Sequence, residues 1–207
     1  MKMKKAALIA GILGAVIIGS SITITQQNEY KLIRQFGKVD RVICEPGISF
    51  KIPLIERTQS LPKETLLYDL EASDVITKDK KTMISDSYVL WRITDPLKFA
   101  QTLNSSLENS ESRINTAVYN ATKNVISSLS QDRVITSRDG ELSDMVMEAI
   151  GDNMEQYGIE LIKFETKQLD LPDDNKAAVY ERMISERDNI AATYKAEGDS
   201  EAKVIQN

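Results

Sequence analysis

The first thirty residues restrict the possible folds more than any other part of the chain. Lys2, Lys4 and Lys5 precede an uncharged run from residue 6 to residue 28. The apolar part of this run, residues 6–24, approaches the roughly 20 residues that a helix needs to cross a bilayer. The sequence therefore predicts a transmembrane helix over residues 6–25, after a short N-terminal segment of residues 1–5.

A cleaved signal peptide is the alternative interpretation of the same segment. A basic start, an apolar stretch and the small residues Gly19, Ser20 and Ser21 also fit that pattern. The anchor is favoured because Ile22 and Ile24 extend the apolar character beyond a typical signal-peptide core. The lysines place the N-terminus in the cytoplasm, so we expect a single-pass protein of the cell membrane with an extracytoplasmic main domain.

Composition removes several classes of function. The formal net charge of -5 and the lack of a basic patch argue against nucleic acid as a partner. The chain contains no histidine, so the commonest general base and the commonest transition-metal ligand are missing. The single cysteine, Cys44, cannot form an internal disulfide or a thiolate zinc site, and we expect it to be a buried thiol in a loop. We therefore expect no enzyme, no catalytic residues, no cofactor and no metal site.

The first half of the body has the pattern of a sheet. Short β-rich runs at residues 30–36, 48–52, 65–70 and 81–93 are separated by Gly and Pro. Residues 87–93 are almost continuously apolar, which is typical of a strand covered on both faces, with Arg92 in a paired or edge position. Asp79 to Met83 has no phosphate-binding glycines and is interpreted as a polar entry to this strand.

The second half switches to helical spacing. Asp95-Pro96 predicts a helix start, with aspartate as the cap and proline at the first helical position. The apolar residues of the next helix recur every three or four positions, namely Ile114, Ala117, Val118, Ala121, Val125 and Leu129. A second helix has the stripe Leu142, Met145, Val146, Ala149, Ile150 and Met154, and Gly158 is expected to end it. Residues 159–171 return to an extended pattern, with Ile162 and Phe164 on one side and Ile159, Leu161, Leu169 and Leu171 on the other.

The C-terminal segment, residues 173–207, is predicted to be a highly charged helix with a thin apolar seam. The seam consists of Tyr180, Ile184, Ala191 and Tyr194, and Arg187, Gly198 and Glu201 interrupt it. Two interpretations stay open, a contact face between neighbouring helices and a solvated single helix.

Two other patterns give only weak support for a metal site or a catalytic site. Asp69, Glu71 and Asp74 lie near one turn, but they lack the glycine and bidentate glutamate of a calcium loop. A Ser-Lys hydrolase has no compulsory spacing, yet nothing here resembles a nucleophile elbow.

Several stretches together resemble a known family. They are RQFGK at 34–38, EPGISFKIP at 45–53, TKDKK at 77–81 and DSYVLWRITD at 86–95, followed by GIE at 158–160 and VYERM at 179–183. On these residues the chain resembles the SPFH group, which comprises stomatins, prohibitins, flotillins and the HflK and HflC protease modulators. It is most similar to the HflC type.

The resemblance implies an α+β fold, with an SPFH domain of antiparallel sheet plus helices over residues 26–172 and an extended C-terminal helix that starts a longer coiled-coil region. It implies a non-catalytic scaffold on membrane lipid, which forms oligomers with an HflK-like partner around an FtsH-type membrane protease. No catalytic residue carries over from the family. The alternatives are a stomatin-like scaffold of lipid microdomains and, from another class, a hydrolase or binding module secreted after signal cleavage.

Overall fold

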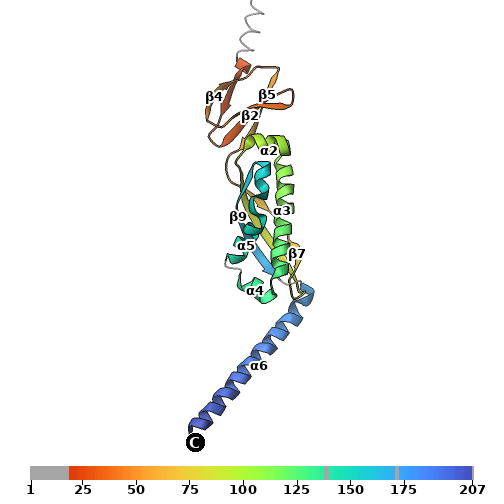
Figure 1. Cartoon of the computed structure of the whole chain (residues 1–207), viewed down its shortest axis with the longest axis vertical. Helices are drawn as coiled ribbons and strands as arrows, with labels where there is room; N and C mark the ends of the chain where they lie inside the picture. The colour runs from red at the N-terminus through yellow and green to blue at the C-terminus, as the bar shows by residue number, and fades with distance from the viewer. Residues whose placement is uncertain (1–18, 138–139, 171–172, 207) are drawn as a thin grey trace, which may run out of the picture.

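The computed structural model describes residues 19–137, 140–170 and 173–206. The molecule is elongated: small sheets lie at the N-terminal end, a mixed layer of sheet and helices lies in the middle, and one long helix leaves the opposite end (Figure 1). The elements are β1 (Ile22–Thr25), β2 (Glu29–Gln35), β3 (Lys38–Ile43), β4 (Gly47–Phe50), β5 (Glu56–Pro62), β6 (Leu66–Asp69), β7 (Ser73–Ile76), β8 (Thr82–Ile93), α2 (Pro96–Leu103), α3 (Leu107–Ser128), α4 (Gln131–Thr136), α5 (Glu141–Ile150), the 3-10 helix η1 (Gly151–Tyr157), β9 (Ile159–Asp170) and α6 (Asp173–Gln206).

All strand pairs are antiparallel. At the N-terminal end β1 pairs with β4, and β2 lies between β3 and β5; in the middle β8 pairs with β6, β7 and β9. The α+β fold and the antiparallel sheets are therefore as predicted. The sequence prediction missed β3, β5 and β7, because none of them contains a run of apolar residues long enough to stand out from a loop.

The core lies between one face of β8 and the helices. Along β8 the side chains alternate, and Val89, Trp91 and Ile93 point inward and are at most 2% exposed. The prediction that this strand is covered on both faces is wrong, since Tyr88 and Leu90 on the other face are only partly buried. Antiparallel sheets commonly leave one face open, and neighbouring strands shield these side chains in place of a second layer.

The cap of α2 is as predicted, whereas the end of α5 and the faces of β9 differ from the prediction. Asp95 caps α2, because its carboxylate accepts hydrogen bonds from the backbone N–H groups of Leu97 (3.1 Å) and Lys98 (2.9 Å). The second helix ends at Ile150 and continues as η1, because Gly151 has a positive φ of 52°. The predicted faces of β9 are wrong: Ile159 and Phe164 are both buried and Ile162 is 42% exposed, since a register shift between Leu90 and Trp91 changes the alternation.

The N-terminal span is predicted mostly for residues outside the described part of the chain. Within residues 19–137, 140–170 and 173–206, no helix has both the length and the apolar character needed to span a membrane. The structure differs from the prediction at the end of the span, because Ile22–Thr25 form β1 and not helix. Cys44 was predicted to be buried and is exposed, since it lies in the exposed loop between β3 and β4.

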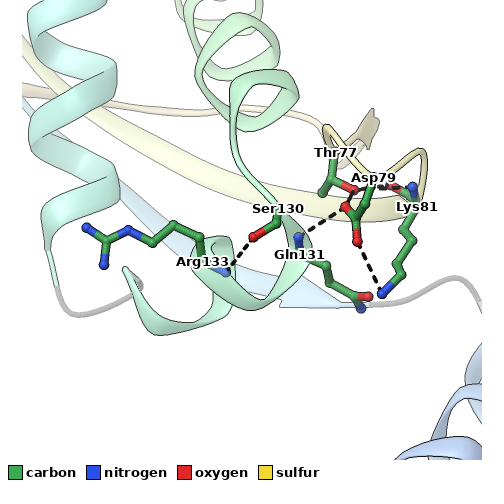
Figure 2. A network of polar contacts seen from close by, with 6 residues as sticks. All are labelled: Thr77, Asp79, Lys81, Ser130, Gln131 and Arg133. Atoms are coloured by element: carbon green, nitrogen blue, oxygen red, sulfur yellow. Dashed lines mark hydrogen bonds and ion pairs between the residues drawn. The ribbon is translucent and has the colours of Figure 1, made fainter.

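A polar junction joins the β7–β8 turn to the helical layer, and we call it the Asp79 corner (Figure 2). The Asp79 carboxylate accepts hydrogen bonds from the Thr77 hydroxyl (2.6 Å) and from the backbone N–H of Gln131 at the start of α4 (3.1 Å), and it pairs with Lys81 (3.2 Å). The hydrogen bond from Thr77 is the largest cause that lowers the Asp79 pKa from 3.8 to about 2. Sequence reasoning treated this segment as a polar strand entry and missed its role, because Gln131 is far away in the chain.

Replacement of Asp79 should change how stability depends on pH. The folded state lowers the Asp79 pKa, so its stabilisation is present at pH values above the ordinary pKa and is lost as the pH falls toward about 2. Asp79→Asn should therefore flatten the acid side of the unfolding curve, measured as Tm against pH. Asp74→Asn on the exposed surface of β7 is the control and should leave that slope unchanged; an identical slope in both variants would contradict the assignment.

Gly158 should be irreplaceable by alanine. It has φ +72°, its carbonyl accepts hydrogen bonds from the N–H groups of Thr94 and Asp95, and a Cβ there would lie 2.3 Å from the Asp95 carbonyl oxygen. Gly158→Ala should cost more than about 2 kcal/mol of unfolding free energy, from backbone strain plus this clash. Gly37→Ala, in the β2–β3 turn, has a positive φ of 86° with nothing within 4 Å of the added Cβ and should cost about 1 kcal/mol. Equal losses in urea unfolding would show that the close approach to Asp95 does not matter.

Candidate functional site: an apolar surface at the N-terminal end

The β1–β4 ribbon has its polarity reversed relative to a water-exposed strand pair. In β1 the polar residues Thr23 and Thr25 are buried, at 9% and 2% exposure. The apolar residues Ile22, Ile24, Ile48 and Phe50 on the ribbon are 45–69% exposed. Because Ile22 pairs with Phe50 and Ile24 with Ile48, all four side chains lie on one face. A strand pair that presents this face is suited to an apolar environment.

The neighbouring turns extend this apolar surface. The connection from β4 to β5 contributes Ile52, Leu54 and Ile55, which are 53%, 100% and 40% exposed, and the β2–β3 turn contributes Phe36 at 86%. Gln35 pairs with both Lys38 and Glu56, so the two turns lie at the same end of the sheet. We call these eight residues the apolar tip: Ile22, Ile24, Phe36, Ile48, Phe50, Ile52, Leu54 and Ile55.

The apolar tip lies where the chain enters the folded part from its N-terminal segment. The backbone N–H of Lys51 donates a 2.7 Å hydrogen bond to the carbonyl of Ser21, and residues 19–20 just before it are helical. The tip is thus adjacent to the end of the segment that the sequence predicts to span the membrane.

Two buried or partly buried carboxylates hold the tip in place. Glu56 is 7% exposed, accepts a 2.8 Å hydrogen bond from the backbone N–H of Ile52 and pairs with Arg41 at 3.3 Å. Lys31 donates a 2.6 Å hydrogen bond to the carbonyl of Ile24 and pairs with Glu29 at 2.8 Å. The hydrogen bond from Lys31 is the main reason that the pKa of Glu29 falls to about 2. Lys31 thus links the Glu29 carboxylate to the backbone of β1.

A second set of contacts fixes the small sheets to the middle of the molecule. Arg34 donates to the Ser105 hydroxyl at 2.7 Å and Gln59 donates to the Ser105 carbonyl at 3.3 Å. Ser105 lies in the turn between α2 and α3 with φ +57° and is 6% exposed. The orientation of the apolar tip is therefore set by a strained, buried turn of the helical layer.

The predicted assembly seam lies on α6, far from the apolar tip (Figure 1). Tyr180, Ile184, Ala191 and Tyr194 are all exposed. Whether they form an interface stays a prediction. The apolar tip itself was missed by sequence reasoning, which assigned Ile22 and Ile24 to the span; the alternation of Thr and Ile in residues 22–25 was the available signal.

Comparison with known proteins connects this architecture to one family. The family model described as "SPFH domain / Band 7 family" matches residues 23–200. The chain belongs to this family. The resemblance drawn from the sequence motifs is thereby confirmed.

Several curated relatives of this SPFH protein bear the HflC name. "Protein HflC" of Haemophilus influenzae is 30% identical over an alignment of 202 residues, which covers 93% of this chain and 68% of that protein. "Modulator of FtsH protease HflC" of Escherichia coli K12 is 25% identical over 250 residues, covering 99% of this chain and 75% of that protein. "Protein HflC" of Vibrio parahaemolyticus is 26% identical over 239 residues, 98% of this chain and 73% of that protein.

The apolar tip should contact lipid in the membrane-bound protein. In a Cys44→Ser background, single cysteines at Ile48 and Leu54 are labelled with the polarity-sensitive dye NBD, in full-length protein reconstituted into phosphatidylcholine vesicles. Emission should shift to the blue and be quenched by spin-labelled lipid, because both side chains are exposed at the tip.

A cysteine at Leu67 is the matched control for this experiment. Leu67 is 61% exposed, close to the 69% of Ile48, but lies on β6 in the middle of the molecule. NBD attached to this cysteine should show the emission wavelength typical of water and should not be quenched by spin-labelled lipid. The same emission at Leu67 and at the two tip positions would contradict a membrane-facing role for the tip.

Proposed function

We propose that this chain is a non-catalytic membrane scaffold of the HflC type, which changes the access of membrane substrates to an FtsH-type protease. The observation that carries the membrane part is the reversed polarity of the β1–β4 ribbon, with isoleucine and phenylalanine outside and threonine inside. Membership of the SPFH family and the HflC names of its relatives support the modulator part.

The proposed arrangement combines an anchor with a second contact to lipid. Residues 1–5 lie in the cytoplasm, the helix from residue 6 to about 20 crosses most of the bilayer, and the apolar tip rests in the leaflet where that helix ends. Full burial of one large apolar side chain contributes about 1.5–3 kcal/mol, so a tip of eight such residues would resist rotation and tilt of the domain on the membrane. Such a fixed orientation is what lateral assembly needs, because neighbouring copies must meet in one geometry.

The scaffold acts by restricting lateral diffusion. With an HflK-like partner it encloses the protease, and membrane substrates must cross this boundary within the bilayer. Soluble substrates approach the protease from the cytoplasm and are not retarded. No step of this mechanism requires a nucleophile, a general base or a metal in this chain.

Deletion of the protein should alter proteolysis selectively. In cells without it, the half-lives of membrane substrates of the FtsH-type protease should change several-fold, while soluble substrates change less. Pulse-chase measurement of one substrate of each kind tests this. Unchanged turnover of membrane substrates, with the HflK-like partner present, would contradict the protease-modulator function and favour a stomatin-like scaffold of lipid microdomains.

Two variants test whether the scaffold function needs the apolar tip or only the presence of the chain. Ile48→Asp introduces a charge on the apolar tip and should fail to restore normal turnover, because a buried unpaired carboxylate is unfavourable in lipid. Leu67→Asp makes the same change at a similarly exposed position away from the tip and should restore it. Equal rescue by both variants would show that the tip is dispensable.

A further inference from the structure

Charge is distributed unevenly along the chain. Residues 22–63, which form the small sheets and the apolar tip, contain seven lysines and arginines and four acidic residues. Residues 64–207 contain sixteen lysines and arginines and twenty-seven acidic residues. The part that carries the apolar tip is thus cationic, with a net charge of +3, although the chain as a whole is acidic.

Three of these cations lie beside the apolar tip without an acidic partner. Lys38 begins β3, Lys51 follows β4, and Arg57 is the second residue of β5. Lys38 and Arg57 are exposed, and Lys51 is partly exposed. Among the residues that the structure describes, none of the three forms an ion pair within 4 Å. We call Lys38, Lys51 and Arg57 the cationic rim.

Strand pairing places the cationic rim at the edge of the apolar tip. Gln35 pairs with Lys38, and its neighbour Arg34 pairs with Arg57, so both cations lie at the end of β2 that carries the β2–β3 turn. Because successive side chains alternate along a strand, Lys38 and Arg57 leave opposite faces of this sheet. Lys51 lies between two residues of the apolar tip in the chain. The three cations therefore border the tip on more than one side.

The acidic side chains at this end of the molecule do not neutralise the cationic rim. Glu56 is 7% exposed, and its carboxylate is already bound by Arg41 at 3.3 Å and by the backbone N–H of Ile52 at 2.8 Å. Asp40 is exposed on β3, two residues after Lys38. The three rim cations outnumber this one available carboxylate, so the surroundings of the tip keep an excess of positive charge.

Cations beside an apolar surface reach the phosphate level of a membrane when that surface enters the acyl region. The aliphatic part of a lysine or arginine side chain lies along apolar groups while its charge stays at the headgroups. Each such cation near an anionic membrane surface contributes about 1 kcal/mol of attraction. Separate cations around an apolar surface suit lipid headgroups better than nucleic acid, which needs a concentrated basic surface.

We propose that the cationic rim binds the phosphate groups of anionic phospholipids, so that the apolar tip gathers these lipids around itself in a mixed membrane. Arg57 presents a planar guanidinium that fits two phosphate oxygens, whereas Lys38 and Lys51 act as point charges. This inference rests on the proposed function, because that function places the apolar tip in lipid.

Quenching by two kinds of spin-labelled lipid tests the proposal. Full-length protein with Cys44→Ser and one NBD-labelled cysteine at Leu54, which is 100% exposed, is reconstituted into phosphatidylcholine vesicles with a minor fraction of phosphatidylglycerol. In matched vesicles the same amount of spin label is carried either by phosphatidylglycerol or by phosphatidylcholine. The label on phosphatidylglycerol should quench NBD at least about twofold more strongly, because the rim raises the local concentration of that lipid.

Removal of the three rim charges should abolish this preference. The variant that combines Lys38→Gln, Lys51→Gln and Arg57→Gln should be quenched equally by the two labelled lipids. Quenching by phosphatidylcholine should persist in this variant, which shows that the tip is still folded and in lipid. High salt should reduce the preference of the wild type in the same direction, because exposed charges are screened.

A matched control removes the same number of charges elsewhere. Lys78 and Lys80 lie in the β7–β8 turn and Lys195 lies on α6, all exposed and away from the tip. The variant that combines Lys78→Gln, Lys80→Gln and Lys195→Gln should keep the preference for phosphatidylglycerol. Loss of the preference in this control would show that net charge, and not the cationic rim, attracts the lipid.

The inference and the proposed function fail in distinguishable ways. Equal quenching of the wild type by both lipids, or a preference that the rim variant retains, would overturn the lipid selection and leave the tip in the membrane. No quenching by either lipid would reject both the selection and the membrane contact of the tip. A preference that depends on the rim, together with unchanged substrate turnover on deletion, would reject the protease-modulator function and support the lipid selection.

Discussion

Burial of one face of β8 is the interaction on which the rest of the structure depends. β8 pairs with β6, β7 and β9, and its inward side chains, with Trp91 fully buried, form the wall against which α2, α3 and α5 pack. Leu32 and Leu61 of the N-terminal sheet join the same core, so that sheet is fixed to the same hydrophobic cluster. Both ends of the molecule are connected to this one strand, because β9 pairs with β8 and precedes α6, and Leu32 of β2 packs in the same cluster as Trp91.

The molecule has apolar surface at both ends and strong polar contacts between its parts. The apolar tip exposes eight large apolar side chains, and α6 exposes Tyr180, Ile184 and Tyr194. Full burial of a large aliphatic or phenylalanine side chain would contribute about 1.5–3 kcal/mol. Between them, Ser105 before the start of α3 and Asp79 at the start of α4 join the helical layer to the strands through directed hydrogen bonds. The middle part of the molecule thus separates two surfaces that expose large apolar side chains, one on the β1–β4 ribbon with its neighbouring turns and one on α6.

Sequence periodicity predicted the elements whose apolar spacing was clear. The start of α2 at Asp95 was as expected, and so were Ile114, Val118 and Ala121 on the buried face of α3, because capping and spacing are local properties. Gly158 ends η1 and not α5, which already ends at Ile150. The faces of β9 and the coverage of β8 were predicted wrongly, since the bulge in β9 and the partial exposure of Tyr88 and Leu90 depend on the neighbouring segments. The short strands β3, β5 and β7 exist because their neighbours supply hydrogen-bond partners, which no local pattern reveals.

The sequence by itself determined the class of the protein. Its motifs indicate the SPFH family, the lack of histidine removes the commonest catalytic chemistry, and the spacing along α6 places its apolar residues on one side, because these properties reside in single residues or in helical periodicity. Only the tertiary structure decided that Ile22 and Ile24 lie on an exposed ribbon, that Glu56 and Lys31 hold that ribbon, and that Asp79 reaches α4. The physical reason is that exposure and ion pairing depend on which distant segments the folded core brings together.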